Sequence, residues 1–86
     1  MTTITKTSED LQVDDILIVN NKALRVVGKW GLTVSLDMYV SDHVKATSYT
    51  MNRKVNLKSG QIYNCLSGEE SKKSLFEIYC LLNTKF

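Results

Sequence analysis

Few residues of this 86-residue chain could combine into a catalytic set. A nucleophile–base–acid arrangement would need the one histidine, His43, beside a hydroxyl or thiol and a carboxylate. Ser41 and Asp42 precede His43 directly, but the side chains of adjacent residues do not point at one another usefully. We therefore expect His43 to be a solvated turn residue, and the sequence predicts no catalytic residue and no enzyme.

Residue types that bind metals are also too sparse to form a site. Asp14 and Asp15 are adjacent, yet no third carboxylate follows at a suitable spacing, so we expect a turn before a strand. Cys65 and Cys80 form no CxxC pair, and His43 would add at most a third ligand, which excludes a structural zinc site. We expect two buried, reduced thiols, no metal ligand and no cofactor.

Basic and aromatic residues gather in the middle of the chain. Residues 23–64 contain six basic and two acidic side chains, whereas residues 1–22 contain two basic and four acidic ones. Cations neutralise phosphates and aromatic rings stack on bases, so this composition suggests RNA or a ribonucleoprotein as the partner. The candidate nucleic-acid contacts are Lys29, Trp30, Lys45, Tyr49, Arg53 and Lys54. The alternative is an ordinary solvated sheet face, because the isoelectric point of about 8.6 is low for a dedicated nucleic-acid domain.

Large aromatic side chains could instead form a protein-binding surface. Trp30, Tyr39 and Tyr49 are of the types that dominate the binding energy of interfaces. Tyr39 alternates in phase with Asp37, so we expect it on a wet sheet face, either covered by the C-terminal segment or available to a partner. This alternative is a protein-binding adaptor or inhibitor, including a small phage-type protein acting on a host factor, which only the small size and lack of motifs suggest.

The elements that must position these residues are mostly strands. In Leu32–Val40, apolar residues alternate with polar ones, which predicts a half-buried strand. Ile16–Val19 and Ala23–Val27 are two further strands, joined by a tight turn at Asn20–Asn21. The glycines of Gly28–Gly31 indicate a bulge or a bend.

The remaining segments are less regular. We expect a turn at Ser41–His43, a long bent strand over Val44–Leu57, a hairpin turn at Lys58–Gln61 and a strand over Ile62–Leu66. Residues 1–8 are expected to form a flexible arm or a short edge strand. Ser8–Leu11 should form one helical or 3₁₀ turn, with Leu11 and Val13 tucked inward.

The C-terminal segment, residues 69–86, fits either a strand or a short helix. Ser67 and Glu70 have the spacing of a capping box, after which one helical face would carry Leu75, Tyr79, Leu82 and Phe86. A strand would instead alternate Phe76, Ile78, Cys80 and Leu82 on its dry face. We favour the strand, because a barrel of five strands needs it to close.

Composition places the chain among small globular domains. Apolar residues make up 43% and charged residues 23%, and the length suffices for one modest core. No apolar run approaches the roughly 20 residues that span a bilayer, and the N-terminus lacks the order of a secretory signal. We expect a cytoplasmic protein that is a single domain over residues 1–86.

The order of these features resembles the N-terminal, KOW-type domain of the elongation factor P family. The residues that carry the resemblance are Ile16–Val27, His43–Lys45, Arg53–Leu57, Ser59–Gly60 and Ser67–Glu69. The resemblance implies an SH3-like barrel and a ribonucleoprotein partner. That family presents a modified lysine on a loop rich in glycine and proline, whereas Val44–Lys45 here runs directly into Ala46–Ser48. The family's activity on the ribosome is therefore not implied.

Together these features predict an all-β, small SH3-like barrel of about five strands that acts as a non-enzymatic binding module. RNA or a ribonucleoprotein is the expected partner, and a protein partner is the alternative. No membrane association is expected. The oligomeric state stays open, because an edge-to-edge dimer would have the same sequence features.

Overall fold

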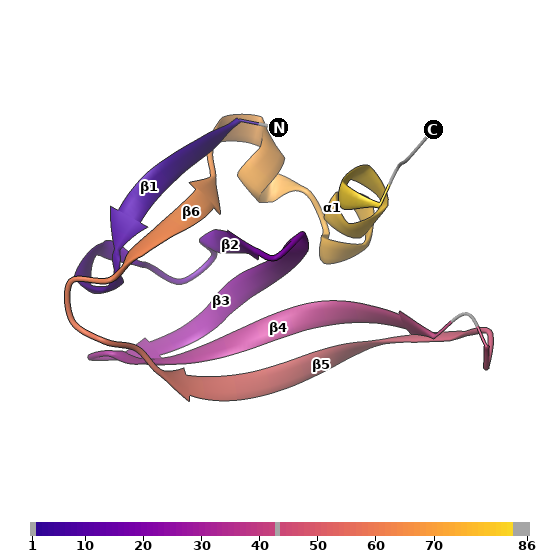
Figure 1. Ribbon diagram of the computed structural model, residues 1–86, viewed down its shortest axis with the longest axis horizontal. Helices are drawn as coiled ribbons and strands as arrows, with labels where there is room; N and C mark the ends of the chain where they lie inside the picture. Colours follow the sequence, from indigo (N-terminus) through magenta and orange to yellow (C-terminus); the bar gives the residue numbers. More distant parts are fainter. Residues whose placement is uncertain (1, 43, 84–86) are drawn as a thin grey trace.

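The chain folds into one antiparallel sheet with a short helix against it (Figure 1). The computed structural model describes residues 2–42 and 44–83. The strands are β1 (Thr3–Thr7), β2 (Ile16–Val19), β3 (Lys22–Trp30), β4 (Thr33–Asp42), β5 (Thr47–Asn56) and β6 (Ile62–Leu66). The helical segments are the 3₁₀ turns η1 (Ser8–Asp10) and η2 (Gly68–Lys72) and helix α1 (Leu75–Leu82). Within the described part, six strands lie in the order β1-β6-β2-β3-β4-β5, which confirms the β-rich class.

A tight hairpin joins β2 to β3, as the sequence predicts. Val19 pairs with Lys22, and the two residues between them, Asn20 and Asn21, have φ angles of 50° and 61°. Asparagine tolerates this left-handed conformation better than most residues do, and two such residues in succession match the twist of a hairpin.

The alternating segment in the middle of the sequence forms β4, also as predicted. Val34 and Leu36 are buried on one face, and the next residue of that phase, Met38, is half-buried. The ladder between β3 and β4 shifts register between Val26 and Gly28, which confirms the predicted bulge. Gly31, in the turn that follows β3, has a φ of 62° that favours glycine.

β4 and β5 continue as a two-stranded ribbon beyond the rest of the sheet (Figure 1). The ladder between β3 and β4 ends at Leu24 opposite Met38, whereas β4 and β5 stay paired as far as Asp42 opposite Thr47. The prediction of a turn at Ser41–His43 is therefore wrong for Ser41 and Asp42, which belong to β4. His43 lies outside the described residues.

The segment after β5 turns but does not make a hairpin. Gly60 has a φ of 75°, and Gln61 N–H donates to the Lys58 carbonyl at 3.4 Å. The strands on either side do not pair, because β6 lies between β1 and β2. The predicted hairpin is therefore wrong, although the turn is present.

The sheet is open and does not close into a barrel. β1 and β5 are its two edges, and β6 meets β2 at one residue pair, Leu17 opposite Cys65. β1 pairs with β6 from Thr3 opposite Leu66 to Thr7 opposite Ile62. Of the two predictions for the N-terminal residues, the short edge strand is therefore right and the flexible arm is wrong. The sheet curls where β6 and β1 fold over β3 and β4 (Figure 1).

The C-terminal segment forms a helix over Leu75–Leu82, so the favoured strand is wrong there and the short helix is present. Phe86, expected on one face of that helix, lies outside the described residues. The helix begins after Ser74, whose Oγ accepts from Glu77 N–H at 3.2 Å and lies 3.3 Å from Glu77 Oε1. The side chain of Ser67, the predicted cap, makes no capping bond to η2. None of the helical segments in the described ranges is long and apolar enough to cross a membrane.

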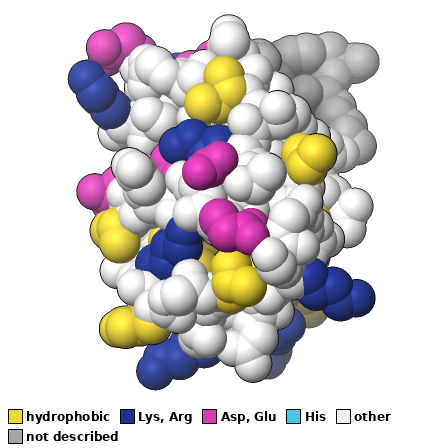
Figure 2. All heavy atoms as spheres, turned by 90° about the vertical axis from the view of Figure 1, so that its left-hand side faces the viewer, with side chains coloured by type: hydrophobic (Ala, Val, Ile, Leu, Met, Phe, Trp, Pro, Cys, Tyr) yellow, Lys and Arg dark blue, Asp and Glu magenta, His cyan; other side chains and the backbone are white. Residues whose placement is uncertain are grey.

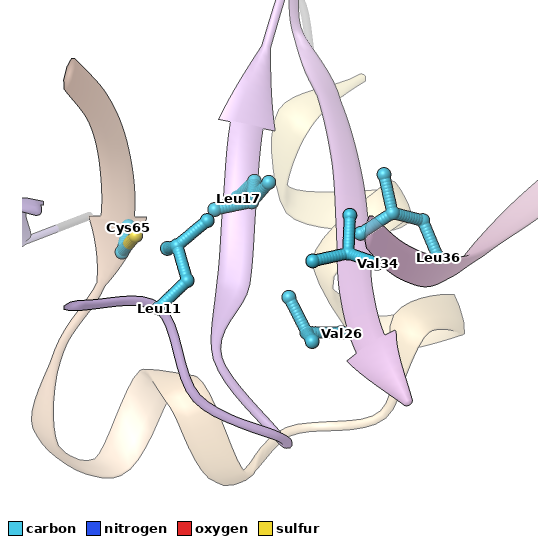
Figure 3. Packing of buried hydrophobic residues seen from close by; sticks show 6 residues of the cluster. All are labelled: Leu11, Leu17, Val26, Val34, Leu36 and Cys65. Carbon is cyan, nitrogen blue, oxygen red and sulfur yellow. The ribbon is translucent and has the colours of Figure 1, made fainter. Parts of the chain in front are cut away.

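Buried side chains form two clusters, one on each side of the sheet. The first cluster comprises Leu11, Leu17, Val26, Val34, Leu36 and Cys65, which point toward one another (Figure 3). The second cluster comprises Ile16, Ala23, Leu66 and Ile78. Because Ile78 is fully buried there, α1 is held against the sheet mainly by burial of apolar surface.

The prediction for the segment before β2 is partly right. Ser8–Asp10 forms the expected 3₁₀ turn, and Leu11 is 1% exposed, as expected. Val13 is 52% exposed, so the prediction that it is tucked inward is wrong. The chain turns at Asp14, which has a φ of 79° and donates its N–H to the Val26 carbonyl at 2.7 Å.

Candidate functional site

The two adjacent aspartates that were considered as metal ligands lie in a turn. Lys6 Nζ lies 3.0 Å from Asp15 Oδ2, and the same carboxylate oxygen accepts from Gln12 N–H at 2.8 Å. Asp14 and Asp15 thus form the turn before β2. The described residues hold no group of three or more histidine, cysteine, aspartate or glutamate side chains that could bind a metal ion.

The two thiols differ in their surroundings. Cys65 is fully buried in the first cluster, where removal from water raises the pKa of its thiol. Cys80 is exposed on α1. The prediction of two buried thiols therefore holds for Cys65 and is wrong for Cys80.

Lys29, one of the predicted nucleic-acid contacts, forms hydrogen bonds within the protein. Its Nζ donates to the carbonyls of Ser8 at 3.1 Å, Glu9 at 2.9 Å and Leu11 at 2.5 Å. An ammonium group has three donors, and all of them are used here. Lys29 therefore caps the chain around η1.

Trp30 lies on the opposite face of β3, and Lys54 joins it there. Ser35 pairs with Gly28 on one side and with Lys54 on the other, so these residues share a face with Trp30. The indole lies over Gly28, where a Cβ would come within 2.6 Å of Trp30 Cη2. Lys54 Nζ is 5.4 Å from the ring centroid, and the Trp30 side chain is 59% exposed. This pair is a small cationic, aromatic platform.

Tyr49 and Arg53 lie on the other face of β5. They alternate in phase with Met51 and Val55, and their partners on β4 are Val40 and Leu36. Lys45 belongs to neither face, because it lies in the turn between β4 and β5. The six predicted contacts are therefore split between two sheet faces, a turn and a structural cap, and they form no single basic stripe.

Tyr39 is covered by α1, which is one of its two predicted outcomes. Its ring lies 5.4 Å from that of Phe76, in an edge-to-face arrangement, and 5.0 Å from that of Tyr79. Tyr39 therefore packs α1 against the face of β4 that the sequence predicted to be exposed to water. It is not the exposed aromatic residue that the protein-binding alternative needs.

A partly apolar groove lies on the face of the sheet that carries Met51. Its volume is about 370 Å³, and its walls come from β2, β3, β4 and β5. The lining residues are Val19, Asn20, Lys22, Leu24, Leu36, Met38, Met51, Arg53 and Val55. Sequence reasoning missed this groove, although the shared phase of Met51, Arg53 and Val55 was a signal of it.

A second hollow of about 310 Å³ separates the start of β3 from α1. It is lined by asparagines of the first hairpin and by apolar residues of α1, among them Tyr79 and Leu82. Among the described residues, the ionisable side chains that line it are Lys22, Tyr39 and Tyr79.

Among the described residues, no strand pairs with the outer edge of β5. Leu57 N–H donates to the Leu32 carbonyl at 2.8 Å, which fixes the side of the strand toward which each N–H points. Backbone groups alternate in direction along a strand, so residues in phase with Leu57 face β4. The outward N–H and C=O groups belong to Ser48, Thr50, Asn52, Lys54 and Asn56. The ladder with β4 has no bulge, and the chain contains no proline that would blunt this edge.

Charges of both signs are interspersed on the end of the molecule that carries η1. Figure 2 shows Lys and Arg side chains next to Asp and Glu, with separate apolar side chains between them. Glu9 accepts from Ser59 Oγ and from Gly60 N–H, the latter at 2.8 Å, and these bonds lower the pKa of its carboxyl group. Acidic and basic side chains therefore lie side by side on part of this end.

No protein-family model, no curated protein and no solved structure matches this chain.

Proposed function

We propose that this protein is a non-enzymatic binding module that binds a protein partner by strand addition along β5. The observation that supports this function best is the ten-residue edge of β5, which pairs with no other strand of the described chain and lies beside the partly apolar groove. An exposed edge strand offers main-chain hydrogen bonds for affinity, and a neighbouring groove gives specificity through alternate side chains.

The groove indicates what the added strand should carry. Alternate side chains of an antiparallel partner would lie beside Met51, Arg53 and Val55, on the face that contains the groove. Apolar or aromatic side chains suit Met51 and Val55, and an aromatic ring or a carboxylate suits Arg53. The expected ligand is an extended segment with large side chains at every second position.

A random peptide library selected on the protein tests this function. Selected peptides should share alternating large side chains, and binding should be lost in Thr50→Pro, because proline removes an outward N–H without disturbing the bonds to β4. Thr50→Val, which keeps the N–H and the β-branched shape, should bind as the parent does. Selected peptides that bind Thr50→Pro equally well would overturn strand addition.

A second candidate is nucleic-acid binding at the platform of Trp30 and Lys54. The exposed indole and its neighbouring cation favour it, because a base could stack on the ring while Lys54 contacts a phosphate. The resemblance of the chain to a KOW-type, SH3-like domain supports a ribonucleoprotein as the source of such a ligand.

Titration of labelled single-stranded RNA and DNA at about 50 and about 200 mM salt tests this candidate. Affinity that falls steeply with salt and drops in Trp30→Ala and Lys54→Ala would support it. Absence of binding at both salt concentrations would remove it and leave strand addition as the function.

A further inference from the structure

We infer that the strand that occupies β5 is the β5 of a second copy of this chain, paired antiparallel about a twofold axis at Met51. The inference rests on the proposed function, because both use the unpaired edge of β5. It joins the sheets of two copies into one continuous sheet. Figure 1 shows that no other strand or helix runs along the outer side of β5.

The direction of the backbone groups limits the possible registers. The outward N–H and C=O groups are those of the even-numbered residues from Ser48 to Asn56. In an antiparallel pair, residues that exchange hydrogen bonds must both face the partner, so even residues pair with even residues. Odd residues then lie opposite odd residues in non-hydrogen-bonded pairs. In every such register one residue lies opposite the same residue of the second copy, and the twofold axis passes between the two.

Charge selects among the central registers. An axis at Arg53 would place that guanidinium opposite its own copy, which is unfavourable. An axis at Asn52 would leave the two Arg53 side chains as diagonal neighbours, about 7–8 Å apart. An axis at Met51 places each Arg53 opposite Tyr49 of the other copy and moves the two arginines well apart. Thr47 of one copy then lies opposite Val55 of the other.

The chosen register also matches side chains to one another. Arg53 opposite an exposed Tyr49 allows a cation–π contact, and Met51 opposite Met51 brings two polarisable thioethers together. On the other face, Lys54 lies opposite Ser48 and Thr50 opposite Asn52, so the outer positions contain no like-charged pair. The strand is therefore complementary to itself without help from another protein.

The other edge of the sheet does not offer the same surface. β1 has five residues, and its beginning is tied down by Thr2, whose N–H donates to Glu70 Oε2 at 2.7 Å. A short edge with a fixed end is a poorer template than the ten residues of β5. The twofold pairing therefore closes one edge of each sheet and gives a dimer rather than a fibre.

Sedimentation equilibrium over a range of concentrations tests the dimer itself. The parent and Thr50→Val should dimerise alike, whereas Thr50→Pro should raise the dimer dissociation constant about tenfold or more, because the symmetric pair loses two N–H donors. A parent that is monomeric at every concentration would overturn the inference. A dimer that is unaffected by Thr50→Pro would also overturn it.

Single cysteines report the register. In a Cys80→Ser background, Met51→Cys should give a disulfide-linked dimer on mild oxidation, because opposite Cα atoms of a non-hydrogen-bonded pair lie about 4.5 Å apart. Asn52→Cys and Arg53→Cys are matched controls whose partners in this register are other residues. Faster cross-linking of Asn52→Cys or Arg53→Cys than of Met51→Cys would overturn the axis at Met51.

The peptide library separates this inference from the proposed function. A monomeric parent that binds peptides through β5, with binding lost in Thr50→Pro, would overturn the second copy as occupant and leave strand addition intact. A monomeric parent that binds no peptide would overturn both. A dimer cross-linked through Met51→Cys supports both, since a second copy is then the added strand.

Discussion

Two lysines that were both predicted to contact nucleic acid have different roles because of the direction in which each points. Lys29 points toward η1, where three backbone carbonyls accept its donors. Lys54 points to the opposite face and lies over the ring of Trp30. Net charge counts both residues equally, but Lys29 uses its donors within the protein whereas Lys54 lies beside an exposed indole.

Replacement of each lysine by methionine should separate these roles. Lys29→Met leaves the carbonyls of Ser8, Glu9 and Leu11 without their donor, so we expect the free energy of unfolding to fall by about 2 kcal/mol. Lys54→Met loses one exposed cation–π contact and should cost about 0.5–1 kcal/mol. Urea unfolding measures both. Equal losses for the two variants would show that Lys29 does not support η1.

For single residues, the sequence shows which side chains share a face of one strand, but it does not show which residues of other strands lie beside them. The phase of Tyr49 and Arg53 along one strand is visible in the sequence and is confirmed. Their separation from Trp30 depends on the register of β4 with both of its neighbours and on the bulge at Gly28. Register is set by pairing across strands, and composition carries no information on it.

Helix α1 shows how packing decides between two local preferences. Residues 75–82 contain strand formers, yet the segment is helical because Ile78 reaches the second cluster and Tyr79 reaches Tyr39. Ser67 and Ser74 each precede a glutamate by three residues, so the sequence contains two equivalent capping patterns. Only Ser74 caps a helix, and the local pattern alone could not distinguish them.

Alanine substitution at the two serines tests which one is the cap. Ser74→Ala removes the acceptor for Glu77 N–H and should lower the free energy of unfolding by about 1 kcal/mol. Ser67→Ala should change it by less than about 0.5 kcal/mol, since its hydroxyl makes no capping bond. Urea unfolding gives both values. The reverse order would place the helix start at Ser67.

The contact between η1 and the turn before β6 should depend on pH. The bonds from Ser59 and Gly60 lower the pKa of Glu9 below its ordinary value of 4.5. A carboxyl group with a lowered pKa in the folded state contributes stability above 4.5, and this stability is lost as the pH falls through the folded value.

Unfolding curves at several acidic pH values measure that contribution. Glu9→Gln, and Ser59→Ala to a lesser extent, should lose less stability than the parent as the pH is lowered below 4.5. Curves for Glu9→Gln that run parallel to those of the parent would exclude Glu9 as a source of the pH dependence.

The molecule as a whole has two cores that share one sheet. β2 contributes Leu17 to the first cluster and Ile16 to the second, so one strand supports both sides. The sequence indicates a β-rich domain with a strand over most of β4, and both are confirmed. It does not indicate that β6 inserts between β1 and β2, because that choice depends on contacts between the two ends of the chain.

Thiol labelling should report how these cores open. Cys80 is exposed and should react rapidly with a thiol reagent in the native protein, whereas Cys65 is fully buried and should react only through opening of the first core. We expect the rates to differ by about a thousandfold or more. Cys80→Ser should abolish the fast reaction alone. Rapid labelling of both thiols would indicate a loose first core.

The pairing of β1 with β6 has a consequence for the order of events during synthesis. Each strand from β2 to β5 pairs with its neighbour in sequence, whereas Thr3 must wait for Leu66. Contacts between distant residues form late, because a long loop must close first. Pulsed hydrogen exchange during refolding should therefore protect the amides of β3 and β4 before those of β1. β1 would be made before the other strands of the sheet and yet pair among the last.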